Sequence, residues 1–238
     1  MMKLIHDDCI AAMEQLPEDS VDMIFCDLPY GTTQNSWDVI IPFEDLWKQY
    51  NRIVKQNGAM VFTASQPFTS LLVSSNITNF RLEWIWKKTI GSGQLNIKRM
   101  PLKHHENVLV FYRSPPVYNE QITKGEPYKI TRKAGSLEEA NYGKQKEHTS
   151  RNNGFRHAQS VIEVSNPRIR GGHPTEKPVS LCEYFIKTYS NEGDTILDNC
   201  MGSGSTGEAC VNLNRNFIGI EKDPEYFKIA EERIDIHI

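Results

Sequence analysis

The 238-residue sequence predicts an α/β fold in which a parallel sheet carries helices on both faces. Three observations lead to this prediction. Short apolar runs of strand length alternate with segments of helical period in both the first and the last third of the chain. Two of the apolar runs end in a carboxylate, at Asp27 and at Glu221. A third run leads into a glycine-rich turn at residues 198–207. A strand that ends in this way usually ends at a site.

The first 112 residues show the alternation element by element. Asp8 is a residue type that caps helix N-termini, and Asn57-Gly58 is typical of a helix C-terminus. After Pro42, large apolar residues recur at spacings of three and four. The expected elements, in chain order, are a strand at residues 2–5, a helix from Asp8 to about residue 16, a strand at 21–26, a helix from Pro42 to residue 57, a strand at 59–62, a helix after Pro67, and strands at 82–86 and 107–112.

The alternation stops between residues 113 and 172 and then returns. Glycine and proline divide this segment into short polar pieces, with Tyr and Phe interleaved among Lys and Arg. We expect an irregular insertion over residues 113–172, with little core of its own, in a domain formed by residues 1–112 and 173–238. The elements expected after it are a helix at 178–189, a strand at 195–197, a helix at 208–213, a strand at 217–220 and a last helix after Pro224.

The charge of the chain is unevenly distributed. The formal net charge is -3, but residues 81–172 contain 17 Lys and Arg against 8 Asp and Glu, whereas the rest contains 10 against 22. A basic segment in an otherwise acidic chain is suited to hold a polyanion, because neutralising phosphates releases counterions and supplies affinity. The alternative is a solvated, charged loop region.

The composition argues against a membrane or secreted protein. Asp7, Asp8 and Glu14 interrupt the segment in which a signal peptide needs an apolar core, and no apolar run approaches the ~18 residues of a membrane span. The five cysteines are scattered without a C-x-x-C pair, which favours free thiols over disulfides and predicts no metal site. We therefore expect a cytoplasmic protein.

The glycine-rich turn predicts a cofactor that contains a nucleoside. Gly202 and Gly204 allow the backbone to approach a ligand closely, and a helix N-terminus with unpaired N–H groups follows them. Glu221 ends the next strand, where a carboxylate can accept hydrogen bonds from both ribose hydroxyls. Gly207 completes a G-x-G-x-x-G pattern, so an NAD-binding dehydrogenase remains an alternative at this point.

Three short motifs occur in a definite order along the chain. Residues 27–30 read D-L-P-Y, residues 173–178 read H-P-T-E-K-P, and residues 198–204 form the glycine-rich turn. In this order they resemble the motifs of the beta-type, circularly permuted DNA methyltransferases that act on exocyclic amines. The resemblance covers nearly the whole chain outside residues 113–172. It implies a Rossmann-like methyltransferase sheet, with residues 113–172 as a target-recognition insertion.

The resemblance implies an enzyme that transfers a methyl group from S-adenosyl-L-methionine to the N6 amine of an adenine flipped out of duplex DNA. Asp27 and the Leu28 carbonyl would accept hydrogen bonds from the amine and direct its lone pair at the methyl group. Pro29 favours an extended Leu28, and the Tyr30 ring would stack on the extracted base. The implied catalytic residues are Asp27, Leu28, Pro29 and Tyr30.

The resemblance also implies a set of cofactor contacts. His173, Thr175 and Lys177 match the family's contacts to the methionine carboxylate, which a cation and a hydroxyl suit. Asp8 and Cys9 match the segment that contacts the cofactor's adenine. The complete set is Asp8, Cys9, Asp27, His173, Thr175, Lys177, Asp198, Cys200, Met201, Gly202, Gly204, Ser205 and Glu221.

Three positions depart from the family pattern. Leu28 replaces the first proline of D-P-P-Y, Cys200 stands where phenylalanine is usual, and Asp7 replaces a glycine. None of these changes removes a group that the chemistry needs. In the insertion, the expected phosphate contacts are Arg151, Arg156, Arg168 and Arg170. The implied partner is double-stranded DNA and not a membrane, and the resemblance also suggests a homodimer and a cognate restriction endonuclease.

Other reactions fit the sequence less well. Methylation at cytosine C5 needs a cysteine nucleophile, usually after a proline, and none of the 12 prolines precedes a cysteine. N4-cytosine enzymes of the same kind more often carry serine where Asp27 stands, and RNA or protein-glutamine methylases tend to carry asparagine. N4-cytosine methylation remains an alternative because its acceptor is also an exocyclic amine. A non-catalytic DNA-binding module remains an alternative as well.

Overall fold

A computed structural model describes residues 1–35, 37–133, 146–166 and 176–235. The chain forms two compact units. The larger unit contains residues 1–119 and 160–238, and the smaller unit contains residues 120–159. None of the described helices is both long enough and apolar enough to cross a membrane.

The larger unit is built on one sheet of eight strands in the order β1-β12-β11-β2-β3-β5-β4-β10. Neighbouring strands are parallel except at β5, which is antiparallel to both β3 and β4. The strands are β1 (Met2–His6), β2 (Val21–Cys26), β3 (Val54–Ala64), β4 (Phe80–Ser92), β5 (Lys103–Phe111), β10 (Val161–Val164), β11 (Thr195–Asp198) and β12 (Asn216–Glu221).

The reversed strand corrects the expectation of a purely parallel sheet. A short segment joins β4 directly to β5, and a short connection can only return the chain antiparallel, because a parallel neighbour needs a crossover of a dozen or more residues. The sequence pattern alone does not show this, since both segments read as apolar strands. The α/β class with helices on both faces is confirmed.

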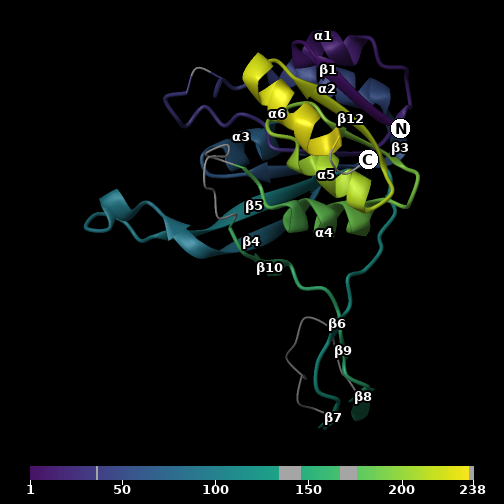
Figure 1. Ribbon diagram of the computed structural model, residues 1–238. Coiled ribbons are helices and arrows are strands. Elements are labelled where there is room, and N and C mark those ends of the chain that lie inside the picture. Colours follow the sequence, from purple (N-terminus) through teal and green to yellow (C-terminus); the bar gives the residue numbers. More distant parts are fainter. Residues whose placement is uncertain (36, 134–145, 167–175, 236–238) are drawn as a thin grey trace. The chain divides into compact units, whose positions relative to one another are not determined.

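Helices cover both faces of the sheet (Figure 1). α4 and α5 lie side by side on one face, and α6 packs on α5. α1 contacts α2 on the other face, where the side chains of α1, α2 and α3 join one buried cluster. The helices are α1 (Cys9–Glu14), α2 (Phe43–Ile53), α3 (Phe68–Ser75), α4 (Val179–Tyr189), α5 (Ser205–Asn212) and α6 (Pro224–Asp235).

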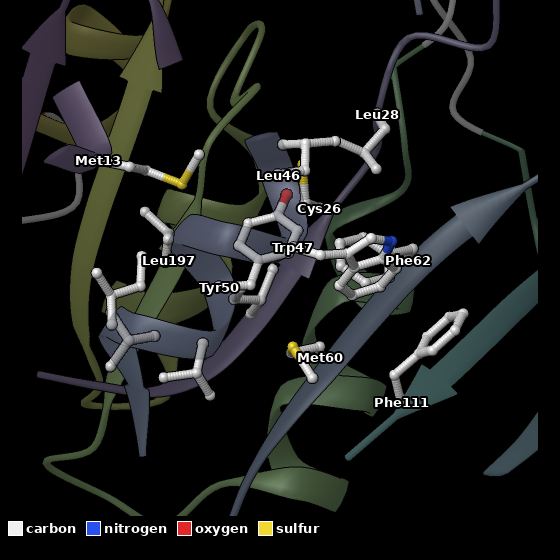
Figure 2. Packing of buried hydrophobic residues seen from close by; sticks show 14 of the residues in the cluster. Met13, Cys26, Leu28, Leu46, Trp47, Tyr50, Met60, Phe62, Phe111 and Leu197 are labelled. Atoms are coloured by element: carbon white, nitrogen blue, oxygen red, sulfur yellow. The ribbon is translucent and has the colours of Figure 1, made fainter. Parts of the chain in front are cut away.

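The core contains a large buried cluster that is rich in aromatic side chains (Figure 2). On the face covered by α2, Trp47 lies edge-on to Phe62 at a centroid distance of 6.0 Å and contacts Phe111 at 5.1 Å. On the other face, Phe25 of β2 stacks on Phe185 of α4 at 6.0 Å. Because β2 points alternate side chains to the two faces, this buried strand holds the chain segment after it in a fixed position.

The end of α2 differs from the expectation. The helix ends at Ile53 and β3 begins at Val54, so Asn57-Gly58 lies inside a strand and not at a helix C-terminus. A Cβ atom at Gly58 would lie 2.5 Å from Val54 Cγ1 and 2.7 Å from the Asp22 carbonyl oxygen. Glycine is therefore required here because two strands approach closely at an irregularity of the β2–β3 register.

The predicted insertion is divided between the two units. Within the smaller unit, β6 (Thr123–Lys124) pairs with β9 (Phe155–Arg156), and β7 (Tyr128–Arg132) pairs with β8 (His148–Asn152). The strand β10 belongs to the larger unit, where it lies parallel to β4. The Trp86 side chain fixes this edge, since its Nε1 donates a 2.9 Å hydrogen bond to the Val164 carbonyl. The apolar run Val-Ile-Glu-Val at residues 161–164 has only four residues and lies among polar pieces, so it was not recognised as a sheet strand.

Candidate active site

The predicted motifs meet at the carboxyl ends of three neighbouring strands. β2 leads to Asp27, β11 ends at Asp198 and β12 ends at Glu221, and these parallel strands are adjacent in the sheet. A cavity of about 1430 Å³ opens at this edge. Thirteen of the predicted site residues line it: Asp8, Cys9, Asp27, Leu28, Pro29, Tyr30, Lys177, Asp198, Cys200, Met201, Gly202, Ser205 and Glu221.

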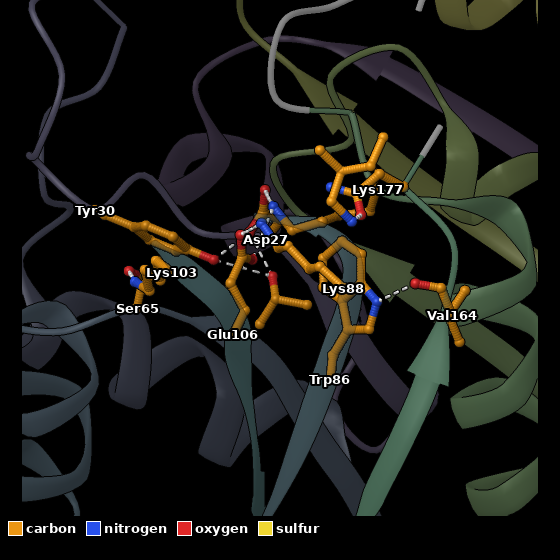
Figure 3. A network of polar contacts seen from close by, with 12 residues as sticks. Asp27, Tyr30, Ser65, Trp86, Lys88, Lys103, Glu106, Val164 and Lys177 are labelled. Carbon is orange, nitrogen blue, oxygen red and sulfur yellow. Dashed lines mark hydrogen bonds and ion pairs between the residues drawn. The ribbon is translucent and has the colours of Figure 1, made fainter. Parts of the chain in front are cut away.

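Asp27 lies at the centre of a hydrogen-bonded network (Figure 3). Its Oδ1 accepts a 2.7 Å hydrogen bond from the Tyr30 hydroxyl and a second, shorter one from the Thr63 hydroxyl. Its Oδ2 pairs with the ammonium group of Lys177 at 2.5 Å. The carboxylate is thus held from both sides by residues of β3, of the D-L-P-Y segment and of the chain just before α4.

Lys177 joins two carboxylates in the wall of the cavity. Its Nζ lies 2.5 Å from Asp27 Oδ2 and 3.7 Å from Glu106 Oε2, and its side chain is only 10% exposed. Burial by itself lowers the pKa of Lys177, but the negative charges of Asp27 and Glu106 outweigh burial and raise it above the ordinary value. Lys177 is therefore a permanent cation at the centre of the site.

Tyr30 is positioned by stacking and by its hydroxyl group. Its ring stacks on Phe68 of α3 at a centroid distance of 5.0 Å, and Lys177 Nζ lies 5.7 Å from the ring centroid. Burial, followed by the charge of Asp27, raises the pKa of Tyr30 well above its ordinary value. The hydroxyl therefore stays neutral and remains a hydrogen-bond donor to Asp27.

The glycine-rich turn forms the other end of the cavity. Gly202 has a φ of +50°, and no atom lies within 4 Å of the position of a Cβ, so its backbone faces open space. Its N–H donates a 2.9 Å hydrogen bond to Glu221 Oε2. Gly204, with a φ of +83°, caps α5 and does not line the cavity, because a Cβ there would lie 3.0 Å from that of Ala230 in α6. Gly204 thus serves the packing of the turn.

A match to a family model identifies the family to which this chain and its cavity belong. The model described as DNA methylase, for N6 and N4 methyltransferases, matches residues 21–232. The chain belongs to this DNA methylase family. The predicted family is therefore confirmed. The match includes the segments that carry Asp27, Lys177 and the glycine-rich turn, and so covers most of the residues that line the cavity.

Curated relatives match over almost the whole chain. The type II methyltransferase M.HpaI of Haemophilus parainfluenzae is 29% identical over 98% of this chain and 74% of its own length. The DNA adenine methyltransferase YhdJ of Escherichia coli K12 is 29% identical over 98% of this chain and 82% of its own length.

Solved structures of DNA methylases share the fold. The crystal structure of the M1.HpyAVI–SAM complex is 28% identical and superposes with a TM-score of 0.69 over 99% of this chain and 100% of that chain. The cytosine-N4-specific PvuII methyltransferase is 16% identical, with a TM-score of 0.68 over 98% of this chain and 86% of that chain. The second likeness concerns the fold alone, so the fold does not distinguish an adenine methylase from a cytosine methylase.

Several site residues of this DNA methylase were not found by sequence reasoning. Glu106 of β5 pairs with both Lys177 and Lys88, and the Lys88 ammonium lies 4.8 Å from the ring centroid of Trp86. Lys103 of β5 donates a hydrogen bond to Ser65 Oγ. Figure 3 shows these side chains around Asp27. The sequence offered one indication of these residues: Glu106 is a charged residue in a strand that ends in the apolar run at residues 108–111, and such a residue often belongs to a site.

A carboxylate also fixes the loop after the D-L-P-Y motif. Asp38 accepts hydrogen bonds from the backbone N–H groups of Gly31, Thr32 and Thr33, at 2.8, 2.9 and 2.7 Å. Burial alone would raise the pKa of Asp38, but these hydrogen bonds, with one from the Thr33 side chain, lower it overall. Asp38 therefore holds this side of the cavity in place as an anion.

Other predicted residues have structural roles or lie away from the cavity, and Asp8 and Cys9 line the cavity and also form the start of a helix. Asp8 caps α1, accepting a 3.1 Å hydrogen bond from Ile10 N, and the adjacent Cys9 begins the helix. Arg156 is used inside the smaller unit, where its guanidinium donates to Asn152 Oδ1 at 2.6 Å and to the Glu126 carbonyl. Arg151 is exposed. His173, Thr175, Arg168 and Arg170 lie outside the described residues.

Asp198 is a buried carboxyl group in the glycine-rich turn. It is 3% exposed, and it accepts hydrogen bonds from Thr206 Oγ1 at 2.6 Å and Cys200 N at 3.1 Å. Burial outweighs these bonds and raises the pKa of Asp198 from 3.8 to about 6. Between these two values the folded chain binds a proton that the unfolded chain does not, so lowering the pH through this window stabilises the fold through Asp198.

This linkage predicts a pH-dependent difference between the wild type and Asp198→Asn, whose side chain does not titrate. Relative to the variant, we expect the wild type to gain about 1 kcal/mol of unfolding free energy between pH 7 and pH 5. Urea unfolding of both proteins at several pH values measures the difference. A difference that stays constant with pH, or that shrinks as the pH falls, contradicts the assigned shift.

Proposed function

We propose that the protein is a site-specific DNA methyltransferase that transfers a methyl group from S-adenosyl-L-methionine to the N6 amine of an adenine flipped out of duplex DNA. The observation that carries the proposal is the Asp27 carboxylate at the wall of the cavity that the glycine-rich turn also lines. The names of two relatives support it, since YhdJ is a DNA adenine methyltransferase and M1.HpyAVI was crystallised with S-adenosylmethionine.

The cavity fits this cofactor. S-adenosylmethionine supplies a methyl group activated by a sulfonium centre. The backbone at Gly202 faces the open cavity, so a ligand can approach it without meeting a side chain. Glu221 is held by Gly202 N and by Asp223 N at 2.8 Å, which orients its carboxylate at the cavity wall, where it can accept ribose hydroxyls. Ser205 lines the same space at the N-terminus of α5.

Asp27 can accept one further hydrogen bond in its present position. A carboxylate offers about four acceptor sites, and three are used, two on Oδ1 by Tyr30 and Thr63 and one on Oδ2 by Lys177. The free site on Oδ2 can receive one N–H of the target amine. With the Leu28 carbonyl as the second acceptor, the amine nitrogen becomes more tetrahedral, and its lone pair turns towards the methyl group.

Lys177 acts on Asp27 in this proposal. Its ammonium holds Oδ2 at 2.5 Å and neutralises part of the charge that Asp27 and Glu106 bring into the wall. The sequence resemblance assigned Lys177 to the methionine carboxylate of the cofactor, and its three N–H donors permit a contact of that kind as well. The two roles are separated by the variants described in the Discussion.

Two alternatives differ in what they require of the site. The family assignment removes the dehydrogenase alternative. N4-cytosine methylation requires the same pair of acceptors for a smaller base, and an enzyme of that specificity shares the fold. We favour adenine because the residue at position 27 is an aspartate and not the serine that is more frequent in N4-cytosine enzymes.

The direct test is to identify the methylated base. The purified chain is incubated with unmethylated duplex DNA and S-adenosylmethionine labelled in the methyl group, and the DNA is digested to nucleosides. We expect the label in N6-methyl-2′-deoxyadenosine, and mapping of the labelled positions defines the recognition sequence. Label in N4-methyl-2′-deoxycytidine supports the alternative, whereas cofactor and DNA binding without transfer supports a non-catalytic module.

The smaller unit, residues 120–159, is the proposed target-recognition element. Its strands β7 and β8 are exposed, and Arg151 of β8 stands opposite Lys129 of β7. Two adjacent exposed cations suit contacts to phosphates. Arg156 instead stabilises the unit itself, because it donates to Asn152 and lies 4.9 Å from the ring centroid of Tyr128.

This assignment predicts how salt affects DNA binding. We expect the affinity of the wild type for duplex DNA to fall steeply with salt, and Arg151→Ala to reduce the log–log slope by about 1. Fluorescence anisotropy between low and moderate salt measures both slopes. An unchanged slope in Arg151→Ala would show that Arg151 does not contact DNA phosphates. A wild-type affinity that does not change with salt would show that the basic segment does not bind DNA.

The proposal includes the remaining partners that the resemblance suggests. A second copy of this chain is tested by sedimentation of the purified protein. A cognate restriction endonuclease is tested by whether DNA methylated at the mapped sequence resists an endonuclease of that specificity. A cytoplasmic location follows from a DNA substrate in a bacterial-type modification system and is tested by cell fractionation.

A further inference from the structure

The hairpin that joins β4 to β5 carries an unusual group of exposed apolar side chains. Ser92 and Lys103 are the last paired residues of the two strands, and residues 93–102, here called the hairpin tip, extend beyond them. Leu95 is fully exposed at 101%, Ile97 is 62% exposed and Met100 is 56% exposed. Apolar side chains gathered on one projecting segment usually mark an interaction surface.

The backbone of the hairpin tip is ordered by its own hydrogen bonds. Gly93, with a φ of +94°, begins a turn of 3₁₀ helix at Gln94–Asn96. The Asn96 carbonyl accepts hydrogen bonds from Arg99 N at 2.8 Å and from Met100 N at 3.0 Å. The Gln94 side chain donates to the Gly91 carbonyl at 2.6 Å. Leu95 therefore extends from a folded turn, which fixes its direction.

The charge around these apolar side chains is positive. Residues 84–105 contain five Lys and Arg and no Asp or Glu. Lys87 and Lys88 are paired with Glu163 and Glu106, but Lys98 and Arg99 are exposed and have no ion pair among the residues that the structure describes. An apolar surface flanked by free cations complements a nucleic acid, in which stacked bases lie between phosphates.

The hairpin tip begins at the rim of the candidate active site. Ser92 and Lys103 both line the cavity, as do Trp86, Lys88 and Glu106 from the same two strands. A duplex that delivers a base to Asp27 must therefore lie at an opening from which residues 93–102 extend. The tip therefore begins beside the opening through which a flipped base would enter.

We propose that the hairpin tip is a DNA wedge, in which Leu95 enters the base stack at the space left by the flipped adenine while Lys98 and Arg99 contact the adjacent phosphates. Flipping disrupts the stacking and pairing of the target base, and an apolar side chain that fills the gap offsets part of this loss. The inference rests on the proposed function and adds a positioning residue that acts on the DNA.

The charge favours DNA over a second copy of the chain as the occupant. Two hairpin tips that packed together would bring the unpaired cations of both copies close to each other, and like charges at close range are unfavourable. Phosphates neutralise the same cations. Self-association through the tip is therefore an outcome that the test must distinguish and not the expected one.

The test compares Leu95→Ser with Ile77→Ser under single-turnover conditions. Ile77 is a matched control because it is also exposed, at 64%, but it follows α3 and does not line the cavity. The substrates are two duplexes with the mapped recognition sequence, one with the target adenine paired to thymine and one with it opposite an abasic site. We expect Leu95→Ser to slow methylation of the paired duplex about tenfold or more, because the wedge no longer offsets flipping.

The second duplex and the charge variants complete the test. On the unpaired target, the defect of Leu95→Ser should shrink to about threefold or less, since less stacking and pairing must be broken. Lys98→Ala/Arg99→Ala should weaken DNA binding and reduce its salt slope by about 2 on both duplexes. Ile77→Ser should match the wild type throughout.

Three results overturn the wedge. Equal rates for Leu95→Ser and the wild type on the paired duplex exclude a role for Leu95. An equal defect on both duplexes indicates a general loss of binding or folding. A change from dimer to monomer in Leu95→Ser, measured by sedimentation without DNA, assigns the tip to a contact between copies. If the wild type itself transfers no methyl group, the proposed function fails first, so the two failures are distinguishable.

Discussion

Asp27→Asn is expected to slow methyl transfer by about 10²–10³-fold while the protein still binds S-adenosylmethionine. The substitution keeps the shape of the side chain, but it removes the negative charge that stabilises positive charge growing on the target nitrogen. Loss of one such electrostatic group typically lowers a rate by about 10²–10³-fold. Single-turnover transfer to duplex DNA measures the rate, and calorimetry with the cofactor measures binding. Asp27→Ala should have the same phenotype.

The matched control is Asp22→Asn on the same strand. Asp22 lies at the opposite end of β2 and does not line the cavity; it pairs with Lys55 at 2.6 Å and accepts a 3.0 Å hydrogen bond from Thr195 N. Its replacement should lower the unfolding free energy by about 1 kcal/mol and leave the rate of transfer within a few-fold of the wild type. Undiminished turnover in Asp27→Asn refutes the assignment of this residue.

Lys177→Met is expected to lower both activity and stability. Without the ammonium, Asp27 and Glu106 are two carboxylates in one wall with no shared cation, and breaking a largely buried pair in this way destabilises a protein by about 3 kcal/mol. The rate should fall by about 10²-fold, because Asp27 loses its fixed position at the target amine. Urea unfolding and single-turnover transfer measure the two effects.

A second substitution at Glu106 tests the cause of this effect. Glu106→Gln removes one of the two carboxylates, so the pair Lys177→Met/Glu106→Gln should recover part of the stability that Lys177→Met loses. Additive losses in the double variant contradict the charge-balance explanation. Two measurements on Lys177→Met distinguish the two roles of Lys177. A lower rate of single-turnover transfer at saturating cofactor supports the contact to Asp27. A loss of cofactor affinity in calorimetry, without a change in that rate, supports a contact to the methionine carboxylate.

The parts of the site that could be predicted from sequence are those encoded by local motifs. Asp27, Gly202 and Glu221 each follow a recognisable apolar strand, and the edge at which parallel strands end is shared. Their meeting around one cavity therefore followed from the α/β pattern itself. Lys177 was singled out by the same kind of local motif, although its contact with Asp27 was not foreseen.

The parts that could not be predicted depend on which strands become neighbours. Glu106, Lys88 and Trp86 come from β4 and β5, and they reach the site because β5 runs back antiparallel beside β3. Periodicity gives the positions of strands but not their order or direction. The same holds for β10, which pairs with β4 and accepts the Trp86–Val164 hydrogen bond, and for Gly58, whose close contacts only the folded β2–β3 pair creates.

The most direct test is a crystal structure of the protein with S-adenosylhomocysteine and a duplex that carries the mapped target site. The account predicts that an adenine is extruded into the cavity, with its N6 at about 2.7–3.2 Å from Asp27 Oδ2 and on the side facing the sulfur atom. A base bound elsewhere, or an Asp27 carboxylate that makes no contact with the target amine, would contradict it.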